Sequence, residues 1–203
     1  MSEKGILITL SGPSGAGKDT VLTELLKMDD SVRVSISMTT REKREYEEDG
    51  VHYYFVTKDY FKNKIKEDKM LEYAEYNGNY YGTPKAPVDE MIAAGKAVIL
   101  EIEVQGAEKI RQKYPDVVSI FLAPPSMSVL EKRLRGRGSE DEEDINHRLV
   151  IACEEMKKAT EFGYIVINDT LENAVDSMET IIKAERLKTS RNRNLISEVI
   201  RNV

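Results

Sequence analysis

The feature of this chain that most constrains its fold is a glycine-rich turn between an apolar run and a helical pattern. The apolar run spans residues 6–10 and the turn spans residues 12–20, after which Leu22, Leu25 and Leu26 recur on one face of a helix. A strand, a glycine-rich turn and a helix form the context that a phosphate-binding loop needs. The sequence therefore predicts a site for a nucleoside triphosphate at this turn.

The chemistry of the turn agrees with this prediction. Its glycines let backbone N–H groups converge, and the N-terminus of the following helix adds partial positive charge. Lys18 supplies a full charge for the β- and γ-phosphates, but Asp19 stands where Ser or Thr usually meets Mg²⁺. We hypothesise that Asp19 contacts Mg²⁺ through a coordinated water and that Thr20 contacts the α-phosphate. The residues expected to bind the triphosphate here are Gly12, Ser14, Gly15, Ala16, Gly17, Lys18, Asp19 and Thr20.

Composition limits the class of protein. A length of 203 residues suits one domain with embedded subdomains or two small domains, and 40% hydrophobic and 33% charged residues are typical of a soluble globular chain. No apolar run is long enough for a membrane span, and the net charge of -6 argues against nucleic acid as the main partner. The only cysteine, Cys153, fits a reducing compartment, so we expect a cytoplasmic location. Its place in a helical pattern predicts a buried side chain.

Strand-like and helical segments alternate along the chain. The strand-like segments are 6–10, 32–36, 97–102, 117–122 and 164–167, and the helical ones are 18–28, 84–94, 104–114, 126–135, 140–161 and 171–188. This alternation predicts an α/β fold with a parallel sheet flanked by helices. Such sheets bind ligands beyond the carboxyl ends of their strands, where the glycine-rich turn lies.

Two segments break this alternation. Residues 37–83 are rich in aromatic and charged residues, and their pattern predicts a small mixed α/β insertion with a helix at 58–67. Residues 136–148 start with glycines and continue as a helix that Ser139 could cap, which predicts a mobile flap. We therefore expect a core of residues 1–34 and 85–203, an insertion of residues 35–84, and a helical lid of residues 136–155. The tail 187–203 predicts a packed or partner-contacting helix, consistent with a monomer or a homodimer.

The insertion begins with two arginines three residues apart. Arg41 and Arg44 lie close in sequence to tyrosines, and guanidinium groups bind phosphate oxygens bidentately. The residues alone leave two interpretations open, a phosphate clamp and an ordinary solvated loop.

Several motifs in a fixed order resemble one family. Residues 37–53 hold a serine, Thr39-Thr40-Arg41, a second arginine and an Asp-Gly-x-x-Tyr ending, and further motifs occupy residues 79–83, 101–106, 123–126, 136–138 and 167–169. Together they resemble guanylate kinase over roughly residues 5–185. One departure is Glu103, where the family usually has Asp. The resemblance implies a P-loop core, a GMP-binding insertion and a lid, which transfer the γ-phosphoryl group of ATP to GMP with Mg²⁺ and give ADP and GDP.

The resemblance also implies roles for individual residues. The GMP phosphate would be held by Arg41, Arg44, Tyr53 and Tyr81, with Glu47 in the same GMP site. Guanine would be recognised by Ser37, Glu72 and Thr83, with Glu101 and Glu103 lining that pocket. The residues expected to act in catalysis are Lys18, Arg41, Arg133, Arg137 and Arg148. Asn168 falls where the family meets the adenine of ATP.

Elementary chemistry supports the guanine assignment. A carboxylate such as Glu72 can accept from both N1–H and N2–H of guanine, and a hydroxyl such as Thr83 can donate to O6. Adenine lacks this pattern, and a site built on hydrogen bonds rejects the mismatched ligand by roughly 10⁴-fold. Without the resemblance, Glu72 would be interpreted as a surface glutamate.

Two alternatives remain at this stage. Ribose 1,5-bisphosphate kinases can carry Gly-Lys-Asp in this loop, but they have no reason to keep Glu72, Thr83 and both clamp arginines. Guanylate-kinase-like phosphopeptide-binding modules typically lose loop residues needed for ATP, whereas Lys18 and its glycines are present here.

Overall fold

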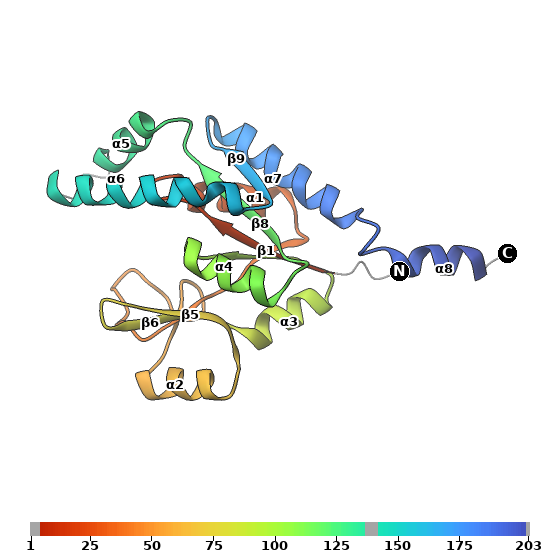
Figure 1. Cartoon of the computed structure of the whole chain (residues 1–203). Coiled ribbons are helices and arrows are strands. Elements are labelled where there is room, and N and C mark those ends of the chain that lie inside the picture. The colour runs from red at the N-terminus through yellow and green to blue at the C-terminus, as the bar shows by residue number, and fades with distance from the viewer. Residues whose placement is uncertain (1–4, 137–141, 202–203) are drawn as a thin grey trace.

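A computed structural model describes residues 5–136 and 142–201 of the chain. Five strands of the described residues form a parallel sheet in the order β2-β7-β1-β8-β9 (Figure 1). These strands are β1 (Ile6–Ser11), β2 (Val32–Val34), β7 (Ala97–Glu101), β8 (Val118–Ala123) and β9 (Tyr164–Ile167). Leu10 of the central strand pairs with Glu101, so the glycine-rich turn and Glu101 lie at the same edge of the sheet.

Helices cover both faces of this sheet (Figure 1). They are α1 (Lys18–Met28), α3 (Lys85–Ala93), α4 (Val104–Lys113), α5 (Met127–Arg135), α6 (Glu142–Lys157) and α7 (Leu171–Arg186), with a 3₁₀ turn at Lys158–Glu161. The last helix, α8 (Arg193–Arg201), extends away from the sheet beyond α7 (Figure 1). Ile6, Ile8 and Leu10 of β1 pack with α1 and α7 on one face. Val98 and Leu100 of β7 pack with α3 and α4 on the other. Because both faces are buried, the strands are nearly continuous apolar runs, as parallel sheets require.

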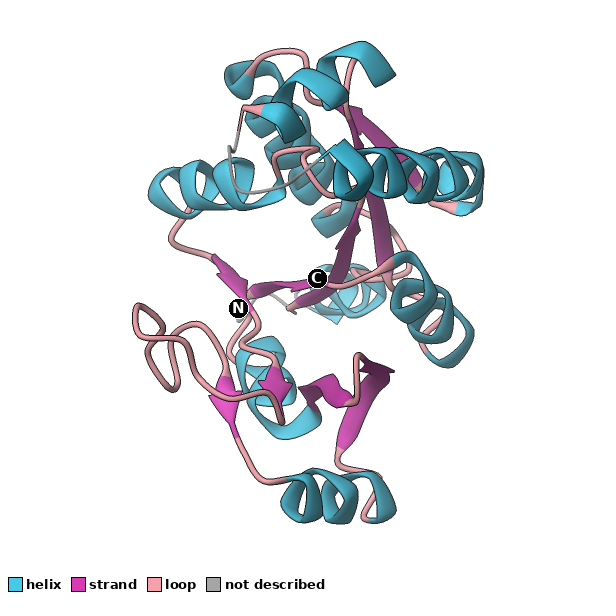
Figure 2. Cartoon of the chain, turned by 90° about the vertical axis from the view of Figure 1, so that its left-hand side faces the viewer, coloured by secondary structure: helices cyan, strands magenta, loops and turns pink. Residues whose placement is uncertain are grey.

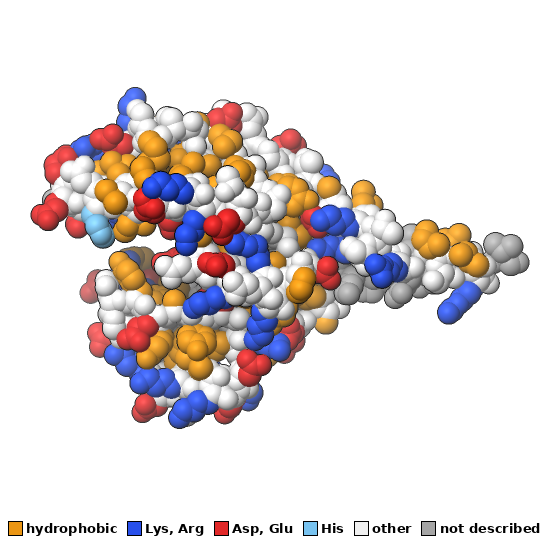
Figure 3. Space-filling model, in the orientation of Figure 1, with side chains coloured by type: hydrophobic (Ala, Val, Ile, Leu, Met, Phe, Trp, Pro, Cys, Tyr) orange, Lys and Arg blue, Asp and Glu red, His pale blue; other side chains and the backbone are white. Residues whose placement is uncertain are grey.

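A second, smaller sheet has the strand order β4-β3-β6-β5 among the described residues. Its strands are β3 (Met38–Thr39), β4 (Tyr54–Phe55), β5 (Met70–Tyr76) and β6 (Asn79–Pro84), and α2 (Lys58–Lys66) packs against it through Phe61. The smaller sheet lies apart from the parallel sheet (Figure 2). The two parts of the molecule are in contact where α4 packs against β5. Figure 3 shows a hollow between them with charged side chains around it.

The predicted α/β fold with a parallel sheet flanked by helices is confirmed. The predicted cap Ser139 lies outside the described residues, so the first described residue of α6 is Glu142. The prediction that Cys153 is buried is wrong, because α6 packs on α5 through Leu149 and Ala152 and leaves Cys153 exposed. Within the described part of the chain, no helix has the length and apolarity needed to cross a bilayer.

Candidate active site

The glycine-rich turn joins β1 directly to α1. Gly17 precedes the helix with φ 95°, and a Cβ there would lie 2.5 Å from the Asn168 amide nitrogen, so only glycine fits. No described side chain caps α1, which leaves its first N–H groups for a ligand. Lys18 Nζ donates to the carbonyls of Gly12 at 2.8 Å and Pro13 at 3.3 Å, so its ammonium lies along the turn. Asp19 and Thr20 are exposed in the first turn of the helix.

Two of the predicted site residues, Asn168 and Arg133, hold the backbone of this turn by hydrogen bonds. Asn168 Nδ2 donates to the Ala16 carbonyl at 2.7 Å, and the Asn168 side chain is buried. Arg133 of α5 reaches the same carbonyl at 3.3 Å and the Asn168 carbonyl at 3.0 Å. The structure therefore brings Asn168 and Arg133 to the peptide backbone of the turn.

The lid helix α6 also reaches the turn. Arg148 donates to the Ser14 hydroxyl at 3.0 Å. Arg137, the other predicted lid arginine, lies outside the described residues. Glu155 lies seven residues after Arg148, two helical turns along the same face, and interacts electrostatically with Lys18. The sequence prediction missed Glu155, although this spacing from Arg148 could have suggested it.

Carboxylates surround the Lys18 ammonium. Burial raises the pKa of Glu101, and the facing Asp19 carboxylate raises it further, while Lys18 opposes both effects. Burial likewise raises the pKa of Glu155, with Glu103 contributing in the same direction. This edge of the sheet thus combines one loop lysine with several acidic groups, and the pKa values of Glu101 and Glu155 are raised.

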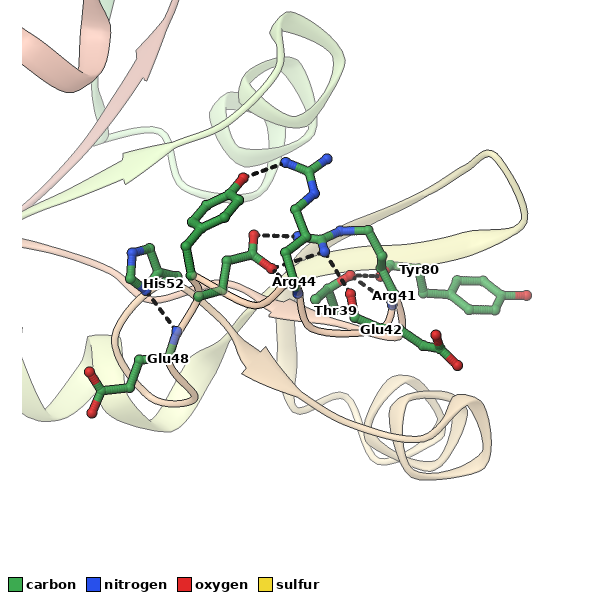
Figure 4. Close-up of polar contacts among 9 residues, drawn as sticks. Thr39, Arg41, Glu42, Arg44, Glu48, His52 and Tyr80 are labelled. Carbon is green, nitrogen blue, oxygen red and sulfur yellow. Dashed lines mark hydrogen bonds and ion pairs between the residues drawn. The ribbon is translucent and has the colours of Figure 1, made fainter.

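The two arginines of the insertion have different environments. Arg41 forms a bidentate pair with Glu47, at 2.7 Å and 3.0 Å. It also donates to the Glu42 carbonyl at 2.6 Å (Figure 4). Glu47 also accepts from the Arg44 backbone N–H at 2.8 Å. Hydrogen bonding to Arg41 lowers the pKa of Glu47 to about 2. The exposed Arg44 side chain donates to the Tyr46 hydroxyl at 2.7 Å.

Aromatic residues complete the surroundings of Arg41. The guanidinium carbon of Arg41 lies 5.7 Å from the centre of the Tyr53 ring. The Arg41 side chain also interacts with the Tyr81 hydroxyl. The Tyr53 and Tyr81 rings meet edge to face at 6.2 Å. Three of the four residues predicted for the GMP phosphate are therefore in mutual contact, whereas the Arg44 side chain pairs with Tyr46.

A cavity of about 260 Å³ lies between the smaller sheet and the start of α4. Predicted residues that line it are Ser37, Tyr53, Glu72, Tyr81, Glu101 and Glu103. Lining residues that the sequence prediction missed include Tyr76, Gln105, Gly106 and Lys109. Tyr76 ends β5, whereas Gln105, Gly106 and Lys109 belong to α4. The helical period predicts that these α4 residues lie near one another, but it does not say what they contact.

Glu72 is the most buried carboxylate of this cavity, with 8% of its surface exposed. Thr83 donates its hydroxyl proton to Glu72 Oε1 at 2.8 Å. A Cβ on Gly106 would lie 3.2 Å from Glu72 Oε2, so a side chain at this position would crowd the carboxylate. Burial raises the pKa of Glu72, against the Thr83 hydrogen bond and the charge of Lys109.

Comparisons with known proteins agree with this arrangement. A family model described as guanylate kinase matches residues 4–185. The chain is similar to the guanylate kinase of Carboxydothermus hydrogenoformans, with 49% identity covering 93% of this chain and 92% of that protein. It is 52% identical to the guanylate kinase of Clostridium acetobutylicum, covering 94% and 91%. A solved guanylate kinase from Anaplasma phagocytophilum superposes with a TM-score of 0.74 at 33% identity, covering 93% and 90%.

Proposed function

Because the chain belongs to the guanylate kinase family, we propose that its glycine-rich loop binds ATP and that the cavity beside the smaller sheet binds GMP. The protein is a nucleoside monophosphate kinase that transfers the γ-phosphoryl group of ATP to GMP, giving ADP and GDP. Family membership favours this activity over a ribose 1,5-bisphosphate kinase and over a phosphopeptide-binding module.

The placement of Glu101 carries the two-substrate proposal. Glu101 lines the cavity and also interacts with Asp19 and Lys18 of the loop. A nucleotide phosphate on the loop and an acceptor in the cavity would therefore be neighbours. This is what in-line transfer needs, because its rate depends mainly on positioning and charge stabilisation.

For GMP, we assign the phosphate to Arg41, Arg44, Tyr53 and Tyr81. Glu47 supports this assignment indirectly, because its bidentate contact holds the Arg41 guanidinium in one orientation. Arg44 would have to leave Tyr46 to reach the same phosphate.

For guanine, we assign Glu72 to N1–H and N2–H and propose further contacts from Ser37 and Thr83. The Thr83 hydroxyl donates to Glu72 here, so donation to O6 requires it to turn when the base binds. These contacts involve the base and phosphate without the ribose 2′-hydroxyl, which supports dGMP as a second acceptor.

Catalysis on this scheme requires no general base. The attacking GMP phosphate oxygen is already ionised near neutral pH. Lys18 and the arginines at 133, 137 and 148 would neutralise the charge that spreads over the transferred group. Arg148 contacts Ser14 and Arg133 contacts Ala16, so both are within reach of phosphates on the loop.

Carboxylates near Lys18 fit the Mg²⁺ that we propose as the metal. Asp19 and Glu101 face one another, and carboxylate oxygens are ligands that Mg²⁺ prefers. Among the described residues, no group of three His, Cys, Asp or Glu side chains is close enough to hold a metal. The nucleotide phosphates would therefore supply the remaining ligands, with Asp19 acting through a coordinated water. The ion would neutralise phosphate charge when bound.

We further propose that residues 35–84 form a GMP-binding subdomain, inserted into a P-loop core of residues 1–34 and 85–203. Residues 136–155 would close as a lid and exclude water. A cytoplasmic location is proposed from the single cysteine.

A coupled assay of ADP formation tests the proposal. We expect ATP consumption with GMP, and none with ribose 1,5-bisphosphate or without an acceptor. Turnover without GMP, or none with it, would contradict the assignment of the two sites.

A further inference from the structure

The base cavity is strongly acidic. Glu72, Glu101 and Glu103 line it, and Lys109 is the only positively charged side chain among its described lining residues. The wall also carries the hydroxyls of Tyr53, Tyr76 and Tyr81, which bring no positive charge. Of the cationic side chains near the cavity, Lys109 is the one whose charge acts on Glu72.

The position of Lys109 is set by a contact between α4 and β5. Its ammonium donates to the Tyr73 carbonyl at 3.0 Å and lies 5.8 Å from the centre of the Tyr73 ring. Tyr73 follows Glu72 on β5, so this hydrogen bond holds the ammonium beside the peptide unit next to the buried carboxylate. The hydrogen bond joins residues 36 apart in the sequence.

The guanine contact proposed for Glu72 requires an ionised carboxylate. Only an ionised carboxylate offers acceptors to both N1–H and N2–H of guanine, because a protonated one presents a donor instead. Burial and the Glu103 carboxylate at the start of α4 both favour protonation of Glu72. The groups that favour ionisation are the Thr83 hydroxyl on β6 and Lys109 on α4.

We propose that Lys109 is a positioning residue for GMP selection, whose ammonium keeps Glu72 ionised and so extends GMP capture to lower pH. This inference rests on the proposed role of Glu72 in guanine recognition. It assigns Lys109 no contact with the reacting phosphates.

The test compares kcat/KM for GMP in the wild type and in Lys109→Gln from about pH 5.5 to about pH 8.5. The substrate phosphate titrates equally in both reactions, so it cancels in the ratio. At the acid end we expect kcat/KM of Lys109→Gln to be about two- to fivefold below that of the wild type, the size of a solvent-screened charge pair. The acid limb of the variant's pH profile should lie at higher pH. The loss should shrink toward the alkaline end, where Glu72 is ionised in both proteins, and KM for ATP should not change.

Controls separate this role from a structural one. Lys113→Gln removes a lysine one turn further along α4 that pairs with Asp68 at 3.3 Å, so it should behave as the wild type. Lys109→Arg should restore the pH profile, and Lys109→Met should reproduce the Gln variant. In a Glu72→Gln background, Lys109→Gln should have no further effect.

A loss that is constant across pH, a loss that persists in the Glu72→Gln background, or no loss would each overturn the inference. If Glu72→Gln lowers kcat/KM for GMP and Lys109→Gln does not, only the role of Lys109 fails. If Glu72→Gln itself leaves kcat/KM for GMP unchanged, the proposed guanine contact fails and the role of Lys109 fails with it.

Discussion

Asn168 offers a test of how the glycine-rich loop, the proposed ATP loop, is held in place. Its buried side-chain amide donates to the Ala16 carbonyl at 2.7 Å, within the loop. Asn168→Ala removes this donor and leaves the carbonyl with only the longer contact from Arg133, at 3.3 Å. We expect a less stable protein in which the loop binds ATP more weakly.

The magnitude follows from that geometry. Leaving a buried acceptor without its partner costs about 1–3 kcal/mol, and the remaining Arg133 contact places the cost near the lower end. For a chain of this length about 1 kcal/mol lowers Tm by about 2–4 °C. If the same energy is lost from ATP binding, KM for ATP rises about fivefold. KM for GMP should change by less, because the hydrogen bond lies on the loop side of the site.

Thermal melting and steady-state kinetics with each nucleotide varied in turn measure these effects. Asn173→Ala is the matched control, because Asn173 is exposed and its amide contacts only the Asp169 carboxylate, at 3.3 Å, in the described structure. An unchanged Tm with an unchanged KM for ATP would refute the bracing role. An equal rise in both KM values would show that the contact does not act through the ATP loop.

Three further predictions concern the same site. Asp19→Ala should raise the Mg²⁺ concentration needed for half-maximal rate by about tenfold, as loss of an outer ligand typically does, and an unchanged Mg²⁺ dependence would exclude the water bridge. Glu47 has a pKa of about 2 in the folded protein against 4.5 ordinarily, so its stabilisation is present above about pH 4.5 and is lost as the pH falls toward 2. Urea unfolding should therefore find Glu47→Gln less stable than wild type at neutral pH, with a gap that closes in acid; a gap independent of pH would argue against the Arg41 pair. Gly17→Ala should abolish ATP-dependent turnover, because the φ of 95° and the contact with Asn168 both exclude a Cβ, and an active variant would contradict the loop geometry.

Much of the fold could be predicted from the sequence because its signals are local. Residues 6–28 predict strand, turn and helix in order, since apolar periodicity and glycine positions are properties of short segments. The alternation of strands and helices then predicts a parallel sheet. The candidate GMP residues were found through motifs, because composition around Glu72 does not distinguish a buried acceptor from a surface glutamate.

The contacts between distant segments could not be predicted in this way. The exposure of Cys153 depends on which face of α6 meets α5, and helical spacing alone does not identify that face. Glu155 lies near Lys18 only because α6 lies across the loop, where Arg148 reaches Ser14 over 134 residues of sequence. The resemblance placed Glu47 in the GMP site, but its bidentate pairing with Arg41 was not predicted and is seen only in the structure.

The sequence by itself determined the glycine-rich turn between strand and helix, the parallel α/β core and the family, because each depends on residue types at fixed short spacings. Only the tertiary structure decided that Asn168 braces the loop through Ala16 and that Lys109 lies beside Glu72, at separations of 152 and 36 residues for the hydrogen bonds involved. The physical reason is that these interactions exist only after β9 docks beside β8 and α4 docks on β5. Docking of that kind depends on shape and burial over the whole core, which no local pattern specifies.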